Sequence, residues 1–437
     1  MKAAIITQPR DGIGENTSLG IITLALARPL SKFCDIVIYG RKNPNVEQPK
    51  YQSDKLKFRY IPVFPDDYFT KAVLKILKII IPDRMKRMPI FAFQLYYIIY
   101  ATLIALDIRR QKCQVAHIHN YSQFVPVIRF FNPSIRIILH MNCEWLTQID
   151  KKVIEPRLRK ADLILSCSGF VTNRNKMQFP SLSNRFETLY NGVDTEVFQR
   201  EIKKDEANSN KKKRLLFVGR VSPEKGVHVL VEAFNLLASK YPDIELDIAG
   251  PLGASSYIIE LDKEKIVQDL AHFYLGHNDY VQYVKDQIKP ELKDKVRFHG
   301  AVDHSDLVNF YNSADIFVFP SVWHEPFGIP VAEAMAAEVP VVTTKSGGIT
   351  EIVENNKNGF TVERNDAIEL FKSMEIFLLN NNLKMEFTRS GRQRAIDVFS
   401  WEKIAHELLQ FYKADLKSNF NTNFISNAAK RNIITEQ

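Results

Sequence analysis

The chain has 437 residues, of which 45% are hydrophobic and 25% charged, and its formal net charge is +9. This length allows two domains with large cores, and the composition excludes a disordered or fibrous chain. The basic residues are dispersed rather than interleaved with aromatic residues along one face, so we expect no nucleic-acid partner. The four cysteines show neither close pairing nor metal-ligand spacing, and the first residues already resemble a strand rather than a signal peptide. We therefore expect reduced thiols and a cytoplasmic location.

Strand-like runs followed by helical periods occur in both halves of the chain. In the first half these runs cover residues 2–7, 34–39, 115–119, 135–140 and 163–166. In the second half they cover residues 215–220, 244–250, 296–300, 315–321, 339–344 and 359–362. This alternation predicts an α/β protein with a doubly wound parallel sheet in each half.

Composition divides the chain into the following expected regions. They are an N-terminal domain over 1–199, a lysine-rich linker over 200–213, a C-terminal domain over 214–399, a helix over 400–416 and a polar tail over 417–437. We expect the helix over 400–416 to pack back toward the N-terminal domain. The connection over 251–294 is unusually long and is interpreted as an insertion, for which the sequence predicts no role.

The turn after the first strand, PRDGIGENTSLG, contains Gly12 and Gly14. It lacks the third glycine of the dinucleotide-binding fingerprint, because Thr17 stands three positions after Gly14. A glycine-rich turn that opens on a helix can bring backbone amides close to a phosphate or a sugar. An ordinary tight turn explains the same glycines equally well.

Two stretches of the first half raise the question of a membrane. In KAVLKILKIII, Lys71, Lys75 and Lys78 share one helical stripe, and more basic residues follow up to position 87. This pattern is typical of an interfacial helix on an anionic membrane, and equally of an ordinary amphipathic surface helix. Residues 88–106 carry no charge, but polar residues such as Gln94 favour a buried helix over a transmembrane one. A peripheral position at the inner membrane face through residues 71–87 therefore remains an alternative.

Two histidines of the first half fall at strand ends that face the expected cleft between the domains. His119 and His140 can each bond a sugar hydroxyl or an acceptor there. We place His119 and the adjacent Asn120 on the acceptor side. No third ligand at metal spacing accompanies the histidines, so we expect no metal.

The first turn of the second half, GRVSPEKG, carries two cations. Arg220 ends a strand and Lys225 stands five residues on, where a helix begins. Both therefore project over the carboxyl edge of the second sheet. A guanidinium fork beside a lysine point charge suits a diphosphate.

The stretch HEPFGIPVAEAMAAEVPVV places Glu325 and Glu333 on either side of two prolines. The prolines exclude one continuous helix, so we expect a loop and then a helix that begins near Pro330. The amides of residues 327–329 then lie at the helix start, where unpaired donors favour an anion. We expect Glu333 in the first turn and Glu325 in the loop, both facing one crevice. Alternatively, Glu333 complements the helix dipole and Glu325 is a solvated acid.

Together, GRVSPEKG, the strand over 315–321, HEPFGIPVAEAMAAEVPVV and SGGITEIVENNKNGF resemble the retaining glycosyltransferases of family 4. The resemblance implies the GT-B fold, in which two Rossmann-like domains face each other across a cleft. It is specific over residues 215–363. The motifs NGVD and FSWEKIA fit too, whereas residues 3–168 match only in general pattern.

The resemblance also implies roles for single residues. On the catalytic side it implies that Arg220 and Lys225 bind the donor diphosphate, that Glu325 contacts the donor sugar and that His140 lies near the reacting centre. On the donor-binding side it implies that Glu333 holds the ribose hydroxyls, with further contacts from Gly14, Phe327, Gly328, Ile329 and Val331. One departure concerns His140, because members often have an acid soon after this histidine, whereas Met141 and Asn142 follow it here.

The expected activity is a retaining, metal-independent transfer of a hexosyl or related group from a nucleotide-diphosphate donor to an acceptor hydroxyl. The acceptor is a glycan, a glycolipid or a small-molecule glycoside, and no cofactor is expected. Two alternatives remain open, namely a sugar-nucleotide epimerase of the same architecture and a non-catalytic nucleotide-sugar binding protein.

Overall fold

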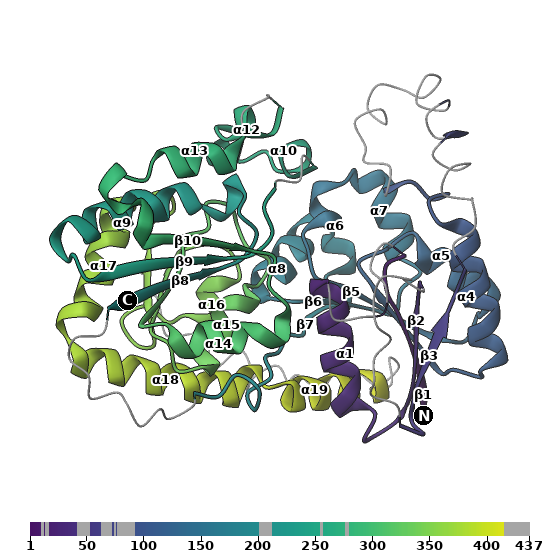
Figure 1. Ribbon diagram of the computed structural model, residues 1–437. Coiled ribbons are helices and arrows are strands. Elements are labelled where there is room, and N and C mark those ends of the chain that lie inside the picture. Colours follow the sequence, from purple (N-terminus) through teal and green to yellow (C-terminus); the bar gives the residue numbers. More distant parts are fainter. Residues whose placement is uncertain are drawn as a thin grey trace.

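Two parallel β-sheets organise the protein in its computed structural model, one in each half of the chain (Figure 1). The structure describes residues 1–9, 13, 17–41, 53–62, 72–73, 76, 92–200, 212–253, 257–275 and 279–414. In Figure 1 the N-terminal sheet lies on the right and the C-terminal sheet on the left, with helices around both. The predicted α/β class with two doubly wound sheets is therefore confirmed.

The N-terminal sheet has seven parallel strands in the order β3-β2-β1-β4-β5-β6-β7. Their bounds are β1 Lys2–Ile6, β2 Asp35–Gly40, β3 Leu56–Tyr60, β4 Val115–His119, β5 Arg136–Met141, β6 Leu163–Ser166 and β7 Phe186–Thr188. The central strands are buried on both faces, which explains their nearly continuous apolar runs. All five strands expected in this half are present, while β3 and β7 at the two edges were not predicted.

Helices cover both faces of this sheet. They are α1 Ser18–Leu30, α4 Ile98–Arg110, α5 Phe124–Phe131, α6 Trp145–Gln148, α7 Lys151–Leu158, α8 Gly169–Gln178 and the 3-10 helix η2 Pro180–Arg185. Side chains cap three of the starts. Thr17 accepts from the amide of Gly20 at 3.0 Å, Asp150 from that of Lys152 at 3.0 Å and Ser168 from that of Val171 at 3.2 Å.

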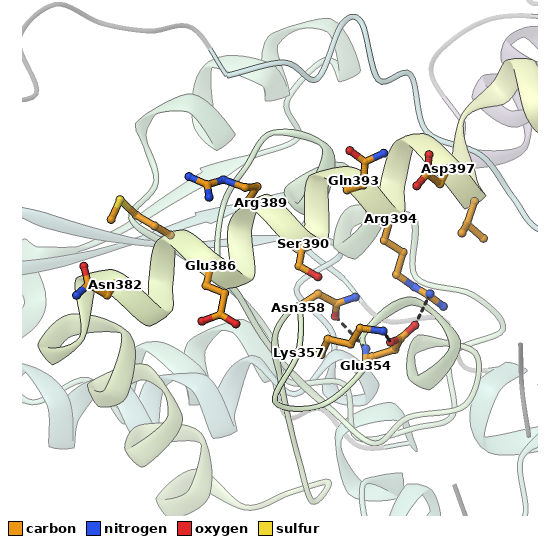
Figure 2. Close-up of a pocket in the computed structure, with 12 residues that line it drawn as sticks. Glu354, Lys357, Asn358, Asn382, Glu386, Arg389, Ser390, Gln393, Arg394 and Asp397 are labelled. Carbon is orange, nitrogen blue, oxygen red and sulfur yellow. Dashed lines mark hydrogen bonds and ion pairs between the residues drawn. The ribbon is translucent and has the colours of Figure 1, made fainter. Parts of the chain in front are cut away.

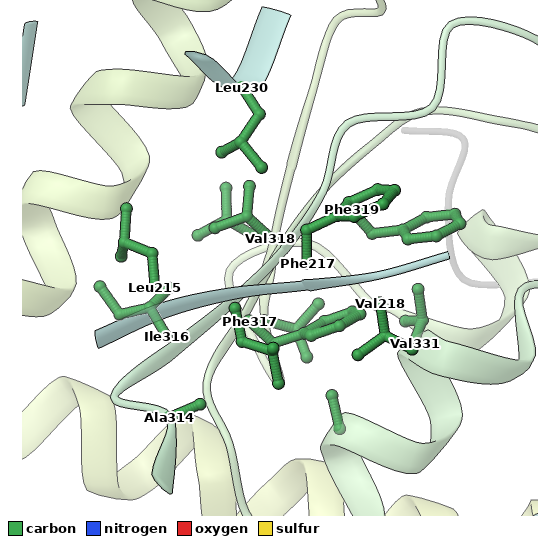
Figure 3. Close-up of a cluster of buried hydrophobic side chains, with 14 of the residues drawn as sticks. Leu215, Phe217, Val218, Leu230, Ala314, Ile316, Phe317, Val318, Phe319 and Val331 are labelled. Carbon is green, nitrogen blue, oxygen red and sulfur yellow. The ribbon is translucent and has the colours of Figure 1, made fainter. Parts of the chain in front are cut away.

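The C-terminal sheet has six parallel strands in the order β10-β9-β8-β11-β12-β13. Their bounds are β8 Lys213–Val218, β9 Ile244–Ala249, β10 Val296–Gly300, β11 Ile316–Phe319, β12 Val341–Thr344 and β13 Phe360–Val362. All six were predicted. Phe217, Phe317 and Phe319 fill the centre of its core (Figure 3), and the rings of Phe217 and Phe319 stack at 5.8 Å.

The helices of the second half surround this sheet. They are α9 Val227–Lys240, α10 Tyr257–Leu261, α11 Lys265–Gln268, α12 Ala271–Leu275, α13 Tyr280–Asp286, α14 Leu307–Ser313, α15 Ile329–Ala336, α16 Ile349–Ile352, α17 Ala367–Leu379 and α18 Asn381–Phe399. Three 3-10 helices, η3 Pro223–Lys225, η4 Pro290–Lys295 and η5 His304–Asp306, complete the set. Helices α10 to α13 lie in the stretch that the sequence marks as an insertion.

The last described helix, α19 Trp401–Lys413, follows α18 but packs against α1 of the N-terminal half (Figure 1). Trp401, Ile404, Leu408 and Tyr412 are buried in one cluster with side chains of α1 and of the N-terminal sheet. The chain therefore crosses from one lobe to the other a second time. Most of the expected linker over 200–213 and all of the tail over 417–437 lie outside the described residues.

Each sheet has a point where its strand order reverses, between β1 and β4 in the first sheet and between β8 and β11 in the second. In open α/β sheets, ligands bind outside the carboxyl ends of the strands at such a point. The loops that follow β8 and β11 are those carrying GRVSPEKG and HEPFG. The topology thus brings together two motifs that are about 100 residues apart in the chain.

The described part of the chain contains no helix with the length and hydropathy needed to cross a membrane. The uncharged stretch over 88–106 ends in α4, where Tyr100, Ala101 and Ile104 are buried, as expected for a buried helix. Lys71, Lys75 and Lys78 lie outside the described residues. Binding of residues 71–87 to an anionic membrane therefore stays a prediction.

Candidate functional site

The loops after β8 and β11 are joined by a buried ion pair. Nζ of Lys225 lies 2.6 Å from Oε1 of Glu325, and the two side chains are 16% and 6% exposed. The same oxygen also accepts from Oγ of Ser321 and Nε1 of Trp323, each at 2.7 Å. No described residue donates to Oε2 of Glu325. Glu325 is therefore held rigidly and is not a solvated acid, while one oxygen stays available to a ligand.

Lys225 is further oriented by two aromatic rings. Its ammonium group lies 5.2 Å from the ring centre of Trp323 and 5.7 Å from that of Phe319. Such cation–π contacts attract an ammonium group to the faces of the rings and so fix its position. The structure thus confines a positive charge at the carboxyl edge of the C-terminal sheet.

Arg220 lies on the same loop as Lys225 and is more exposed, at 38% of its side chain. Its Nη1 is 3.9 Å from Oε1 of the buried Glu224. Glu224 accepts from Ser222 Oγ at 2.7 Å, and its carbonyl accepts from the amide of Val322 at 2.9 Å. The carboxylate therefore pairs within the Arg220 loop through Ser222, while the carbonyl ties this loop to the one after β11.

The start of α15 presents unpaired backbone donors. In the described structure, the amides of Phe327, Gly328 and Ile329 donate to no other group. Gly328 precedes the helix with φ 115°, a conformation that residues with a side chain rarely adopt. The predicted anion site at residues 327–329 is therefore available at the N-terminus of an eight-residue helix.

A pair of glycines supports this loop from behind. A Cβ on Gly347 would lie 2.4 Å from the carbonyl oxygen of Glu325, and one on Gly348 would lie 2.4 Å from that of Pro326. The amide of Gly348 donates to the Glu325 carbonyl at 2.8 Å. The structure shows that the two glycines permit close packing of two backbone segments.

Glu333 differs from its prediction in one respect, because α15 begins at Ile329 and Glu333 lies in the second turn rather than the first. It is 3% exposed, so it is not a surface acid that complements the helix dipole. Nε2 of His304 lies 2.6 Å from one of its oxygens, and the hydroxyl of Tyr311 donates to the other at 2.9 Å. A carboxylate can accept about four hydrogen bonds, so two positions remain for a ligand.

The predicted ligand contact of Val331 is at odds with the structure. Its side chain is fully buried in the core, and its amide donates to the carbonyl of Gly328 at 3.0 Å. Val331 therefore packs the helix onto the sheet. Gly14, the predicted donor contact from the other lobe, lies outside the described residues.

On the N-terminal side the structure brings three histidines together. His117 and His119 are two residues apart on β4, so they share one face of the sheet. His140 lies on the neighbouring β5. His117 Nε2 is 3.1 Å from His140 Nδ1, while His117 Nδ1 bonds the hydroxyl of Tyr412 at 2.8 Å. His117 was not among the predicted site residues, although its two-residue spacing from His119 is visible in the sequence.

This group is the one set of three possible metal ligands among the described residues, with nitrogen atoms within 4.8 Å of one another. His117 is thus a third potential ligand, which the sequence-based expectation wrongly excluded. Both nitrogens of His117 are already hydrogen-bonded, and its ring stacks on those of His119 and His140 rather than converging on a point with them. As arranged, the histidines form a hydrogen-bonded stack. Burial lowers the pKa of His140 to about 4, so its ring is neutral at neutral pH.

An acid that the sequence analysis did not single out lies close to His140 in the chain. Glu144 is 6% exposed and pairs with Arg174. Burial raises the pKa of Glu144 to about 7, although Arg174 lowers it, and Asp262 and Glu264 of the other lobe raise it further. Because the charges of Asp262 and Glu264 act on Glu144, this carboxyl group lies near the boundary between the two lobes. A carboxyl group that titrates near neutral pH could exchange protons there.

The raised pKa of Glu144 predicts a pH-dependent stability. The folded protein holds this proton more tightly than the unfolded chain, so the stabilisation is complete below pH 4.5 and is lost as the pH rises through about 7. Between pH 4.5 and 8, the free energy of unfolding of the unsubstituted protein should fall by up to about 3 kcal/mol more than that of Glu144→Gln. Urea unfolding of both proteins across this range measures the difference. Parallel curves, like those expected for the exposed control Glu386→Gln, would contradict the assignment.

The two lobes touch beside the site. The carboxylate of Glu351 accepts from the amides of Gly169 and Phe170 at 2.8 and 2.7 Å and from the hydroxyl of Tyr190 at 3.0 Å. The carboxylate comes from α16 and the donors from the N-terminal half. An acid at the start of α8 is favourable, because unpaired amides and the positive end of the helix dipole meet there.

A groove of about 840 Å³ lies elsewhere, along α18 and the loop over 354–358 (Figure 2). Its walls carry side chains of both charges, including Lys357, Glu386 and Arg389. None of the predicted site residues lines it. Its size alone does not make it the functional site, because the buried ion pair and the unpaired amides lie at the other position.

Comparison with known proteins gives three kinds of likeness. A family model described as glycosyl transferases group 1 matches residues 198–394. Spore coat protein SA of Bacillus subtilis (strain 168) is 26% identical over 329 residues, which cover 72% of this chain and 82% of that protein.

Solved structures resemble nearly the whole chain. A glycosyltransferase from Rickettsia africae ESF-5 matches with a TM-score of 0.68 at 19% identity, over 95% of this chain and 99% of that one. Anabaena Alr3699/HepE, solved in complex with UDP-glucose, matches with a TM-score of 0.64 at 16% identity, over 94% and 99%. These matches show the fold, and they confirm the expected GT-B arrangement of two Rossmann-like lobes.

Proposed function

We propose that the protein moves a sugar from a nucleotide-diphosphate donor to an acceptor hydroxyl, because residues 198–394 match the family model of the glycosyl transferases group 1. The observation that carries this proposal is the buried Lys225–Glu325 pair beside the unpaired amides of residues 327–329. The donor diphosphate lies against these groups and Arg220. The acceptor is a carbohydrate, a lipid-linked sugar or a small-molecule glycoside, and it binds on the side of His119 and Asn120.

Charge on the leaving group explains how this site accelerates the reaction. As the glycosidic bond stretches, negative charge grows on the diphosphate. Lys225, Arg220 and the helix amides are already aimed at that position, so little reorganisation is needed. Glu325 orients Lys225 through one oxygen and contacts the donor sugar through the other. Glu333 binds the ribose hydroxyls with the two acceptor positions that His304 and Tyr311 leave open.

The reaction proceeds with retention of the anomeric configuration. Of the two buried acids of these loops, Glu224 is engaged by protein donors through both oxygens and Glu325 through one. We assign neither of them the role of a nucleophile. In this proposal no covalent intermediate forms on either acid. The acceptor attacks from the face that the diphosphate leaves, so the leaving phosphate takes the acceptor proton and the configuration is retained. Hydrolases of glycosides work differently, because they place two carboxylates on opposite faces.

A panel of nucleotide-sugars, incubated without acceptor, tests the proposal. We expect slow hydrolysis of one donor, with the UDP-sugars tested first, and NMR should show that the released sugar initially keeps its anomeric configuration. Conversion of the donor into an epimer would instead support the sugar-nucleotide epimerase alternative. Binding without any turnover, with acceptors also present, would leave the non-catalytic alternative.

The same assay tests metal independence. Fixed cations and amides neutralise the diphosphate in this proposal, so EDTA should leave the hydrolysis rate within about twofold. Loss of activity in EDTA, with recovery on adding Mg²⁺ or Mn²⁺, would show that a bound metal supplies charge that we assign to Arg220 and Lys225.

A further inference from the structure

The N-terminal lobe contains a buried arginine without an acidic partner. Arg157 lies in the last turn of α7 and is 5% exposed. Its Nη2 donates to the carbonyl of Ala92 at 2.8 Å, and its Nη1 donates to Oγ of Ser122 at 3.4 Å. No carboxylate of the described structure pairs with it. Two of its five N–H groups are thus engaged, and three remain.

A buried cation without a counter-ion is costly, because it loses hydration that only a nearby anion restores. Burial lowers the pKa of Arg157 to about 10, so the guanidinium stays charged at neutral pH. The partial negative charge at the carboxyl end of α7 offsets part of this cost. Among the described residues, the buried acids each have a basic partner, as Glu325 has Lys225. The positive charge at Arg157 is therefore poised for an anion that the described residues do not supply.

The guanidinium lines a small cavity just beyond the carboxyl end of β4. The walls also include Asn120, Ser122 and Trp145. The volume is about 10 Å³, which is room for a single oxygen atom or water molecule. The cavity therefore fits one oxygen of a larger group and not a whole sugar.

The cavity lies on the edge of the sheet that the proposed function assigns to the acceptor. Oδ1 of Asn120 accepts from the amide of Asn142 at 2.6 Å, and the Asn142 side chain bonds Nδ1 of His119 at 3.1 Å. Asn120 thus connects the cavity to the histidine stack. A group held by Arg157 would sit beside the residues proposed to meet the acceptor.

We infer that Arg157 binds an anionic substituent of the acceptor, a phosphate or a carboxylate, by placing one of its oxygens in this cavity. The inference rests on the proposed function, because it assigns the acceptor to the N-terminal lobe. It narrows the acceptor class to sugars or glycosides that carry such a group. Arg157 thereby determines acceptor specificity without touching the donor.

The melting temperature of an Arg157 variant distinguishes a purely structural role of this residue from a role in binding a ligand. If its bonds to Ala92 and Ser122 mainly hold the fold together, Arg157→Met should lower the melting temperature. If the charge serves a ligand, removing a buried unpaired cation should leave the melting temperature unchanged or raise it. Arg159→Met is the matched control, because Arg159 lies just beyond the same helix, is 56% exposed and pairs with Glu155.

The first measurement uses inorganic phosphate as the probe. At 20 mM phosphate, compared with chloride at equal ionic strength, we expect the melting temperature to rise by about 2 to 4 °C for the unsubstituted protein and for Arg159→Met. Arg157→Met should show no rise. Equal shifts in all three proteins, or a destabilised Arg157→Met without phosphate, would overturn the inference.

The second measurement compares acceptors that differ only in charge, namely glucose, glucose 6-phosphate and glucuronate. Arg157→Met should raise KM for the anionic acceptor that works by about 10- to 100-fold, while donor hydrolysis stays unchanged. Preference for the phosphate or for the carboxylate then distinguishes the two sources of the anion. Equal use of glucose and its charged analogues by the unsubstituted protein would contradict the inference. Absent donor hydrolysis would instead count against the proposed function, and the phosphate shift would still decide the role of Arg157.

Discussion

Replacing Lys225 by alanine should lower kcat/KM for the donor by about 10²- to 10³-fold, mainly through kcat. The ammonium group is oriented by Glu325 and by two aromatic rings at the edge where the diphosphate is proposed to leave. Its electrostatic effect is therefore largest in the transition state, when the leaving group is most charged. Arg220→Ala should lower the rate less, because its side chain is more exposed. Steady-state kinetics of donor hydrolysis measure both effects.

A stability control is needed, because Lys225→Ala leaves Glu325 buried without its cation. Breaking one half of a buried pair costs about 3 to 5 kcal/mol. The double variant Lys225→Met/Glu325→Gln removes both charges and should recover most of that stability without recovering activity. Lys240→Ala, which breaks an exposed pair with Glu375, should leave the rate unchanged. Full turnover by a folded Lys225→Ala, Arg220→Ala variant would show that the site is misplaced.

The second large effect on kcat/KM is expected from substitution of Glu333. Its carboxylate is fixed by His304 and Tyr311, and the two acceptor positions that remain are proposed to take the ribose hydroxyls of the donor. Glu333→Gln replaces one acceptor oxygen by an amide, so kcat/KM should fall by about 10- to 100-fold, mostly through KM. The same variant should destabilise the fold slightly, because the buried Tyr311 hydroxyl loses a charged partner.

Donors that contain deoxyribose distinguish two explanations for a slower Glu333→Gln variant, namely loss of the contact with ribose and a general loss of folding. The unsubstituted protein should use 2′- or 3′-deoxyribose analogues of its donor about 10-fold less well, and Glu333→Gln should discriminate much less. The exposed control Glu386→Gln should discriminate like the unsubstituted protein. If Glu333→Gln keeps the full preference for ribose, then Glu333 supports the helix and does not bind the donor.

The strands of both sheets could be predicted because most are buried on both faces and therefore appear as continuous apolar runs. The two missed strands have different patterns. In β3 only Leu56 is buried, and exposed residues alternate along the rest, as suits an edge strand. The other, β7, is three residues long and begins with one buried phenylalanine, Phe186. The alternation in β3 is a strand signal that was overlooked, whereas β7 is too short to give one.

Much of the candidate site could be predicted as a set of motifs, but not its internal bonding. The contact of Lys225 with Glu325 joins residues 100 positions apart, and no local pattern encodes it. The helix start near Pro330 was predicted correctly. Because the helix begins at Ile329, Glu333 lies in its second turn and not in the predicted first turn. Glu144 was visible four residues after His140, but only its burial gives it an unusual pKa.

Arg157 shows a second limit of prediction from the sequence. In the sequence it is one basic residue among several in EPRLRK. Its significance comes from what surrounds it, namely a water-sized cavity and the lack of a carboxylate within the described structure. Periodicity indicates which residues are buried, but it does not indicate which buried charges lack a partner.

A crystal structure of the protein with the nucleoside diphosphate of its donor tests the central claim most directly. We predict that diphosphate oxygens lie within hydrogen-bonding distance of Lys225 Nζ and of amides among residues 327–329, with Arg220 facing them. A nucleotide bound in the groove along α18, with Lys225 and those amides still without a ligand, would contradict the account.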